Sequence, residues 1–181
     1  MGFLVFVRAK VDLAVVETGL GGRLDATNVV EPTVSVITSI GLDHCDLLGH
    51  DLADIAREKA GIVKQDVPVV IGRMPSEAKG SIHRVAEELQ ARVFEVEDAF
   101  PKAPLDLPET NLEGTFQRWN AGSALVASQV LGERFGRVPQ GECRSSGATR
   151  LRGVKPPARH AARHECLGLV AVGALFERRH S

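Results

Sequence analysis

The sequence has few cysteines, and their number and spacing exclude the usual cysteine-based sites. Its 181 residues contain three, at Cys45, Cys143 and Cys166. They neither pair at metal-ligand spacing nor make an even set for disulfides. We predict no disulfide, and this cysteine usage is typical of a protein of the reducing cytoplasm.

Long apolar runs and an excess of one charge are also missing. The start, MGFLVFVRAK, has an apolar run of only five residues with its charges after the run, unlike a secretory signal. No stretch approaches the roughly 20 apolar residues that a membrane span needs. The 22 basic residues nearly balance the 23 acidic ones, so no global field points to nucleic acid or an anionic membrane. We therefore expect a small-molecule or protein partner.

The sequence does contain enough apolar residues, 44%, for one buried core. Strand and helix patterns alternate along it. Apolar runs predict strands at 11–16, 34–38, 67–71 and 93–96, and periodicity predicts helices from Asp51 to Gly61, after Pro75 and over 118–131, with a proline-containing loop at 99–109. This alternation is typical of an α/β fold with a parallel sheet. Ligands gather at the carboxyl ends of such strands, where Glu17 and His44 follow their runs.

The segment ETGLGGRLDATN, residues 17–28, carries several groups suited to binding a ligand. Its three glycines allow a ligand to approach the backbone closely. Arg23 adds a planar donor fork, and Asp25 and Asn28 add hydrogen-bonding groups. Taken alone, the pattern also fits an ordinary turn after a strand, and both interpretations stay open.

His44 and Lys59 are the other candidates for chemistry. His44 beside Glu17 at one sheet edge could hold a divalent cation, although Mg²⁺ prefers oxygen ligands. A hydrogen-bonded structural histidine is the alternative. Lys59 falls on the apolar stripe of its predicted helix, so its ammonium must be paired, neutral or chemically altered. Both snorkelling past the apolar stem and carbamylation by carbon dioxide stay open.

Three strings in register resemble one family. VDLAVVETGLGGRLDATN, SVITSIGLDH and REKAGIVK are similar to the central domain of folylpolyglutamate synthases and dihydrofolate synthases, members of the Mur ligase superfamily. The spacing also matches, since His44 follows Glu17 by 27 residues and Lys59 follows His44 by 15. The fold implied is α/β, a Mur ligase central domain with a mostly parallel sheet flanked by helices and incomplete at both ends.

The resemblance also implies roles for particular residues. In that family the matching glutamate and histidine ligate Mg²⁺, which implies Glu17 and His44 as metal ligands. The matching lysine is carbamylated and organises the metal site, which implies this role for Lys59. The LDA string borders the pterin substrate in the family, which implies Leu24, Asp25 and Ala26 as substrate-binding residues.

A fourth string, FQRWNAGSAL, resembles the family helix whose asparagine contacts the adenine of ATP. The match implies Asn120 as an ATP-binding residue. Phe116 departs from the family pattern, because a histidine is common at that position. This departure weakens the resemblance of this helix alone.

The resemblance implies an ATP-dependent ligase that adds L-glutamate to folate or dihydropteroate through an acyl phosphate. Such an enzyme requires Mg²⁺ and ATP, and members of the family are usually monomeric, while we expect a cytoplasmic location from the cysteine usage. The family holds phosphates with a glycine-rich loop that ends in Gly-Lys-Ser/Thr, and no such string occurs in these residues. We therefore expect 1–138 to be a partial ATP-binding domain that is inactive by itself. A noncatalytic fragment or degenerate gene product is the alternative, and another Mur-type amino acid ligase is a further one.

Residues 139–181 have a different composition and read as an atypical basic tail. From 141 onwards eight Lys or Arg face three Glu, a net charge of +5 within a chain whose net charge is −1. The segment shows no family string, and only LGLVAVGALF resumes an apolar run. Translation in a shifted reading frame is one hypothesis, and a disordered, solvated basic extension is the alternative.

Overall fold

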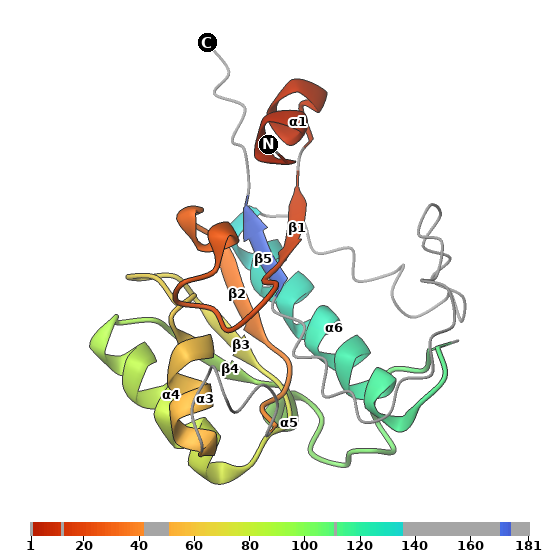
Figure 1. Cartoon of the computed structure of the whole chain (residues 1–181). Coiled ribbons are helices and arrows are strands. Elements are labelled where there is room, and N and C mark those ends of the chain that lie inside the picture. The colour runs from red at the N-terminus through yellow and green to blue at the C-terminus, as the bar shows by residue number, and fades with distance from the viewer. Residues whose placement is uncertain (1, 12, 42–50, 111, 136–170, 175–181) are drawn as a thin grey trace.

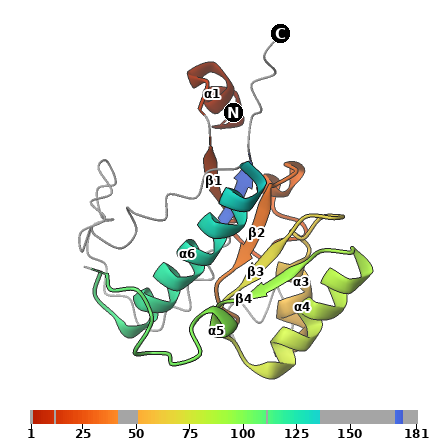
Figure 2. The same cartoon turned by 180° about the vertical axis from the view of Figure 1, so that it is seen from behind.

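The chain folds into a five-stranded sheet with helices on both faces (Figures 1 and 2). The computed structural model describes residues 2–11, 13–41, 51–110, 112–135 and 171–174. The elements in chain order are α1 (Gly2–Ala9), β1 (Ala14–Glu17), the 3₁₀ turn η1 (Ala26–Val29), β2 (Val34–Ile37), α3 (Leu52–Ala60), β3 (Val69–Ile71), α4 (Ser76–Glu88), β4 (Val93–Glu95), α5 (Val96–Ala99), α6 (Thr115–Phe135) and β5 (Ala171–Ala174).

The sheet has the strand order β1-β5-β2-β3-β4. β3 pairs in parallel with β2 and with β4, with Val70 opposite both Val36 and Phe94. β5 lies antiparallel to β1 and to β2. Since both neighbours oppose β5, β1 runs in the same direction as the other three strands. The predicted α/β fold with a mostly parallel sheet is therefore confirmed.

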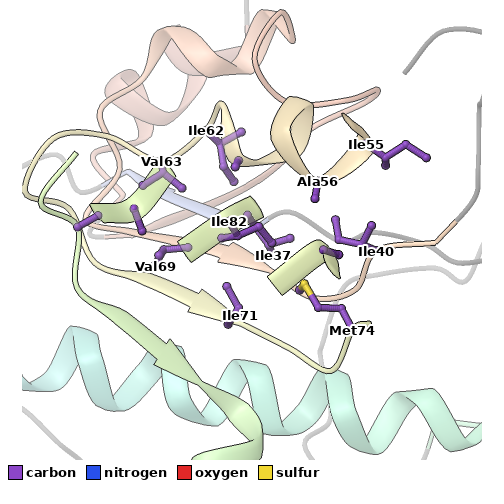
Figure 3. Packing of buried hydrophobic residues seen from close by; sticks show 14 of the residues in the cluster. Ile37, Ile40, Ile55, Ala56, Ile62, Val63, Val69, Ile71, Met74 and Ile82 are labelled. Atoms are coloured by element: carbon purple, nitrogen blue, oxygen red, sulfur yellow. The ribbon is translucent and has the colours of Figure 1, made fainter. Parts of the chain in front are cut away.

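Alternating side chains along the central strands build two apolar layers, as the two-residue period of a strand requires. Ile37 and Ile71 point toward α3 and α4, where they pack in one cluster with Ile55 and Ile82 (Figure 3). On the opposite face, a second cluster joins β2, β3 and α5 to α6 through Val34, Val36, Val70, Val96, Val126, Ala127 and Val130. Burying each large aliphatic side chain contributes about 1.5–3 kcal/mol. Both faces of β2 and β3 are thus covered, which explains why these strands are apolar except for Ser35, whose buried hydroxyl donates to the Ile62 carbonyl at 3.1 Å.

Helix α3 has the ends that the sequence predicts. The Asp51 side chain accepts a hydrogen bond from the Asp54 N–H, which caps the first turn, and Gly61 follows the last helical residue. Ile55, Ala56 and Ala60 are buried, whereas Lys59 at the margin of that stripe is half-buried. Local capping signals thus fixed these boundaries.

Four segments differ from the predictions. β1 begins at Ala14, later than the strand predicted for 11–16, and it is an edge strand whose Val15 is 69% exposed. The predicted strand at 93–96 ends at Glu95, because Val96 begins α5. The predicted helix over 118–131 is longer at both ends in α6. No strand was predicted beyond residue 136, yet β5 forms within the apolar run at 167–176.

No helix in the described part of the chain is long and apolar enough to cross a membrane.

Candidate functional site

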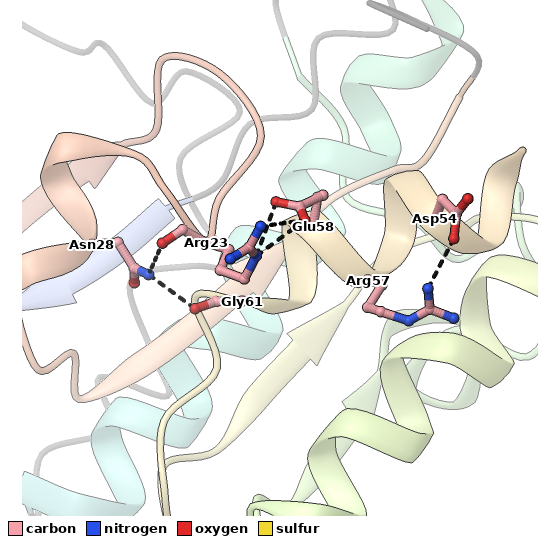
Figure 4. A network of polar contacts seen from close by, with 6 residues as sticks. All are labelled: Arg23, Asn28, Asp54, Arg57, Glu58 and Gly61. Atoms are coloured by element: carbon pink, nitrogen blue, oxygen red, sulfur yellow. Dashed lines mark hydrogen bonds and ion pairs between the residues drawn. The ribbon is translucent and has the colours of Figure 1, made fainter. Parts of the chain in front are cut away.

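The glycine-rich loop, residues 18–28, leaves β1 and docks against the end of α3 (Figure 4). Arg23 donates from Nε to Glu58 Oε1 at 3.0 Å, and its Nη2 lies 2.9 Å from the same oxygen. The Arg23 N–H also donates to the Glu58 carbonyl at 2.9 Å. Gly22 lies so close that an added Cβ would be 2.8 Å from the carbonyl oxygens of Glu58 and Lys59. The loop and the helix that carries Lys59 are therefore one packed unit.

Asn28 closes the same contact from the other end of the loop. Its Nδ2 donates to the Arg23 carbonyl at 3.0 Å and to the Gly61 carbonyl at 2.9 Å (Figure 4). Lys64 Nζ in turn donates to the Asn28 carbonyl at 3.0 Å. The hydrogen-bonding capacity of Arg23 and Asn28 thus serves the loop's own structure.

The Asp25 carboxylate shapes the loop from within. It accepts hydrogen bonds from the N–H groups of Gly19, Leu20 and Thr27 at 2.8, 3.2 and 2.8 Å, and from the Thr27 hydroxyl at 2.5 Å. Burial alone would raise the pKa of Asp25, but these hydrogen bonds outweigh it and lower the pKa below its ordinary value. Its neighbour Leu24 is 79% exposed, and Ala26 is also exposed. The loop therefore holds Asp25 inward and presents the other two residues of the predicted LDA site outward.

The predicted metal and lysine residues occupy separate elements. Glu17 is the last residue of β1, and its exposed carboxylate makes no hydrogen bond or ion pair among the described residues. A carboxylate oxygen of this kind suits Mg²⁺. Lys59 is half-buried near the end of α3 and has an interaction partner. His44 lies outside the described residues. Within the described ranges no three His, Cys, Asp or Glu side chains are grouped to hold a metal ion.

A pocket of about 750 Å³ opens at the carboxyl ends of three adjacent parallel strands. Thr38 and Ser39 follow β2, Arg73 follows β3 and Glu97 follows β4, while Asn120 enters from α6. The remaining walls are mostly aromatic or proline, and are formed by Phe100, Pro101, Ala103, Pro104, Thr115, Phe116 and Trp119. Aromatic walls with a few convergent polar groups are typical of small-molecule sites.

Two cations near the pocket are held by neighbouring side chains. The Arg73 guanidinium carbon lies 5.4 Å from the ring centroid of Trp119, within range for a cation–π contact. Lys79 on α4 lies 2.7 Å from Glu95 and also contacts Glu97. Burial alone would lower the pKa of Lys79, but hydrogen bonds to both glutamates outweigh it and raise that pKa. Lys79 therefore stays charged.

Glu95 connects this pair to a third residue. The hydrogen bond from Lys79 lowers the pKa of Glu95 most, and a second contact to His83 Nε2 at 2.8 Å lowers it further. Both partners favour the ionised carboxylate. The group beside the pocket therefore pairs the Lys79 ammonium with two carboxylates across α4, β4 and α5, and His83 is hydrogen-bonded to one of them.

The structure brings only part of the predicted site together. The glycine-rich loop meets the helix of Lys59, whereas Asn120 lies in the pocket, which none of Glu17, Leu24 or Lys59 lines among the described residues. The sequence patterns did not identify Arg73, Glu97 and Trp119 as pocket residues. The first two carry the same signal as Glu17, a charged side chain placed just after a predicted strand.

Comparison with known proteins gives one consistent result. A folylpolyglutamate synthase from Arabidopsis thaliana is 39% identical over 167 residues, which cover 84% of this chain and 27% of that protein. A dihydrofolate synthase/folylpolyglutamate synthase from Bacillus subtilis is 41% identical over 148 residues, which cover 71% of this chain and 34% of that protein. The chain thus spans about a third or less of these relatives. No protein-family model matches it.

A solved structure agrees with these relatives. The folylpolyglutamate synthase complex with AMPPCP and folate superimposes with a TM-score of 0.64 at 28% identity, covering 75% of this chain and 38% of that one. A TM-score of this size over three quarters of the chain supports the same sheet and helix arrangement as in Figure 1.

Proposed function

Because this chain belongs to the folylpolyglutamate and dihydrofolate synthase family and has the central domain fold of Mur ligases, we propose that it contributes the ATP-binding part of a glutamate ligase. Residues 1–138 form this partial domain in the proposal, and 139–181 form an extension that supplies β5. A cytoplasmic location and a monomeric state stay predictions.

The proposed reaction forms an amide bond in two steps. A carboxylate of folate or dihydropteroate attacks the γ-phosphorus of ATP, which gives an acyl phosphate and ADP. The amine of L-glutamate then attacks the acyl carbon and phosphate leaves. The names of the two relatives, and the solved complex with AMPPCP and folate, support these substrates. The protein's contribution is positioning and electrostatic stabilisation of the transferred group.

The proposed roles of the site residues come from the resemblance, and exposure supports those of Leu24 and Ala26. Glu17 and His44 would hold Mg²⁺, which when bound neutralises charge on phosphate oxygens. Lys59, carbamylated or not, would organise that site from α3. Leu24 and Ala26 are exposed and border the pterin in this proposal. Asp25 contributes indirectly, since its carboxylate is committed to Gly19, Leu20 and Thr27.

The observation that carries the nucleotide proposal is the place of Asn120. It lines an aromatic pocket at the carboxyl ends of β2, β3 and β4, beside Trp119 and Phe116. An aromatic wall stacks on a base, and a side-chain amide can both accept from and donate to the edge of adenine. Phe116, the departure from the family pattern, widens the aromatic wall instead of adding a polar group.

ATP binding can be measured directly, because Trp119 is the chain's single tryptophan and lines the pocket. We expect ATP to change its fluorescence with saturation. Asn120→Ala should raise Kd about tenfold, since each hydrogen bond to the base contributes about 1–1.5 kcal/mol. Gln129→Ala, an exposed change on the same helix and away from the pocket, should leave Kd unchanged. An ATP titration without any saturable change would refute the nucleotide proposal.

The alternative proposal is a noncatalytic nucleotide-binding protein. The absence of a Gly-Lys-Ser/Thr string from the 181 residues favours it for this chain by itself. ATP-dependent phosphate release with folate or dihydropteroate, L-glutamate and Mg²⁺ separates the two. Turnover that Glu17→Ala abolishes would rule out the noncatalytic alternative, and release with a cell-wall peptide precursor in place of folate would indicate another Mur-type ligase.

A further inference from the structure

The pocket has one anionic side chain among the described residues that line it. Its twelve lining residues include only two that carry a full charge, Arg73 and Glu97. Arg73 lies over the face of Trp119, and is thus part of the aromatic wall. Glu97 has a side chain that is 37% exposed, lies in the first turn of α5 and is one of the residues that line the space a ligand would fill.

Lys79 fixes how Glu97 faces that space. Its Nζ contacts Glu97 Oε2 and, at 2.7 Å, Glu95 Oε2. Lys79 is only 20% exposed, so the pair is less screened than one at the open surface. In the described part of the chain no hydrogen bond reaches Glu97 Oε1. Glu97 therefore keeps one oxygen on Lys79 and has the other available at the pocket wall.

A carboxylate that offers one acceptor oxygen discriminates between the edges of the purine bases. An ionised carboxylate only accepts hydrogen bonds. The exocyclic amine of adenine donates one hydrogen to Asn120 and has a second available for a single acceptor. Guanine presents a carbonyl oxygen at the same position, which an acceptor repels. Guanine has two adjacent N–H donors elsewhere on the ring, and they suit a carboxylate whose two oxygens are both unbonded. Glu97 is not such a carboxylate, because Lys79 binds one of its oxygens.

We infer that Glu97, oriented by Lys79, accepts a hydrogen bond from the exocyclic amine of adenine and so makes the pocket select adenine over other purines. This specificity role rests on the proposed nucleotide function of the pocket. Glu97 would touch the ligand, whereas Lys79 is a positioning residue that acts through Glu97. His83 and Glu95 complete the hydrogen-bonded group behind them.

The test is a double-mutant cycle between protein and ligand. Adenosine is compared with purine riboside, which has a hydrogen in place of the exocyclic amine, by Trp119 fluorescence on the full chain. We expect the wild type to bind adenosine at least about tenfold more tightly, the difference that a hydrogen bond to a charged acceptor makes. In Glu97→Ala this ratio should fall by about tenfold, and the preference that remains should come from the hydrogen bond between the amine and Asn120. Lys79→Met should reduce the wild-type ratio by a smaller factor.

The matched control is Asp98→Ala, because Asp98 is exposed, adjacent to Glu97 in α5 and absent from the pocket lining. It should keep the wild-type ratio. An unchanged ratio in Glu97→Ala would overturn this inference and leave the nucleotide proposal standing. Tighter binding of guanosine than adenosine, lost in Glu97→Ala, would also overturn it, since Glu97 would then read paired donors. No binding of either nucleoside to the wild type would overturn both proposals.

Discussion

The glycine-rich loop and the pocket use their polar side chains in opposite ways. In the loop, Arg23, Asp25 and Asn28 are bonded to other parts of the chain. In the pocket, Glu97 Oε1 and Asn120 Oδ1 accept no hydrogen bond from the described residues, although Asn120 Nδ2 donates to Gln117 at 3.1 Å. Both regions lie beside strands and both carry the residue types that a ligand site needs.

The difference shows that residue type alone does not separate shaping a site from contacting a ligand. The loop residues hold a backbone close to α3, where Lys59 lies. The pocket residues are supported by others, such as Lys79 behind Glu97. We therefore expect changes in the loop to reduce stability first, and changes in the pocket to reduce binding first.

Glycine substitutions should give the largest effects. An added Cβ at Gly72 would lie 2.0 Å from the Thr38 carbonyl oxygen, and at Gly22 it would lie 2.8 Å from two carbonyls of α3. Because neither backbone can move freely, we expect the free energy of unfolding to fall by about 3 kcal/mol in Gly72→Ala and about 2 kcal/mol in Gly22→Ala. Urea denaturation measures both.

The same pair of variants tests the contrast between the regions. Gly72 adjoins Thr38 and Arg73 of the pocket, so its change should also weaken adenosine binding, whereas Gly22→Ala should leave binding intact. Gly80→Ala is the control, because nothing lies within 4 Å of an added Cβ there and alanine favours a helix interior by about 0.5–1 kcal/mol. Equal losses of adenosine binding in Gly72→Ala and Gly22→Ala would contradict the expected difference between the pocket and the loop.

Ion pairs should give a middle-sized effect. Arg23 and Glu58 join the loop to α3 with two contacts to one oxygen, while Arg57 and Asp54 form an i,i+3 pair within α3 at 2.8 Å (Figure 4). With Arg23 at 56% exposure, we expect a coupling energy of about 1 kcal/mol for the first pair and about 0.3 kcal/mol for the second. Double-mutant cycles by denaturation measure both, and equal couplings would show that Arg23 does not fasten the loop.

Much of the fold was predictable because its signals are local. The Asp51 cap and Gly61 set the ends of α3, and the apolar runs of β2 and β3 reflect helices on both faces. β5 was not predicted, because its pairing with β1 joins residues more than 150 positions apart, and an apolar run does not encode its partner. Val15 is exposed because the second apolar cluster does not reach its face of β1, whereas Ala14 and Val16 belong to the first cluster.

The candidate site was predictable to a similar extent. Asn120 was assigned to ATP by its resemblance, and it does line a pocket at the strand ends. Glu97 was missed, because its significance depends on Lys79, which lies 18 residues earlier and meets it only after α4 packs beside β4. The substrate-binding role of Asp25 stays a prediction. Its carboxylate accepts four hydrogen bonds within the loop, and these depend on a turn that the spacing of residues in the sequence does not reveal.

Acid sensitivity of the loop should give the smallest effect. The pKa of Asp25 is lowered on folding, so its contribution to stability is complete above the unfolded pKa of about 3.9 and is lost as the pH falls through the folded pKa. We expect Asp25→Asn to be less stable than the wild type at about pH 7, and this difference to shrink toward about pH 3. Denaturation at both pH values measures it, with exposed Asp98→Asn as a control that should leave the free energy of unfolding unchanged at about pH 7. Because the loop's shape depends on an ionised Asp25, a constant difference across this range would mean that the carboxylate's charge does not hold the loop, and that Arg23 and Asn28 suffice to keep it on α3.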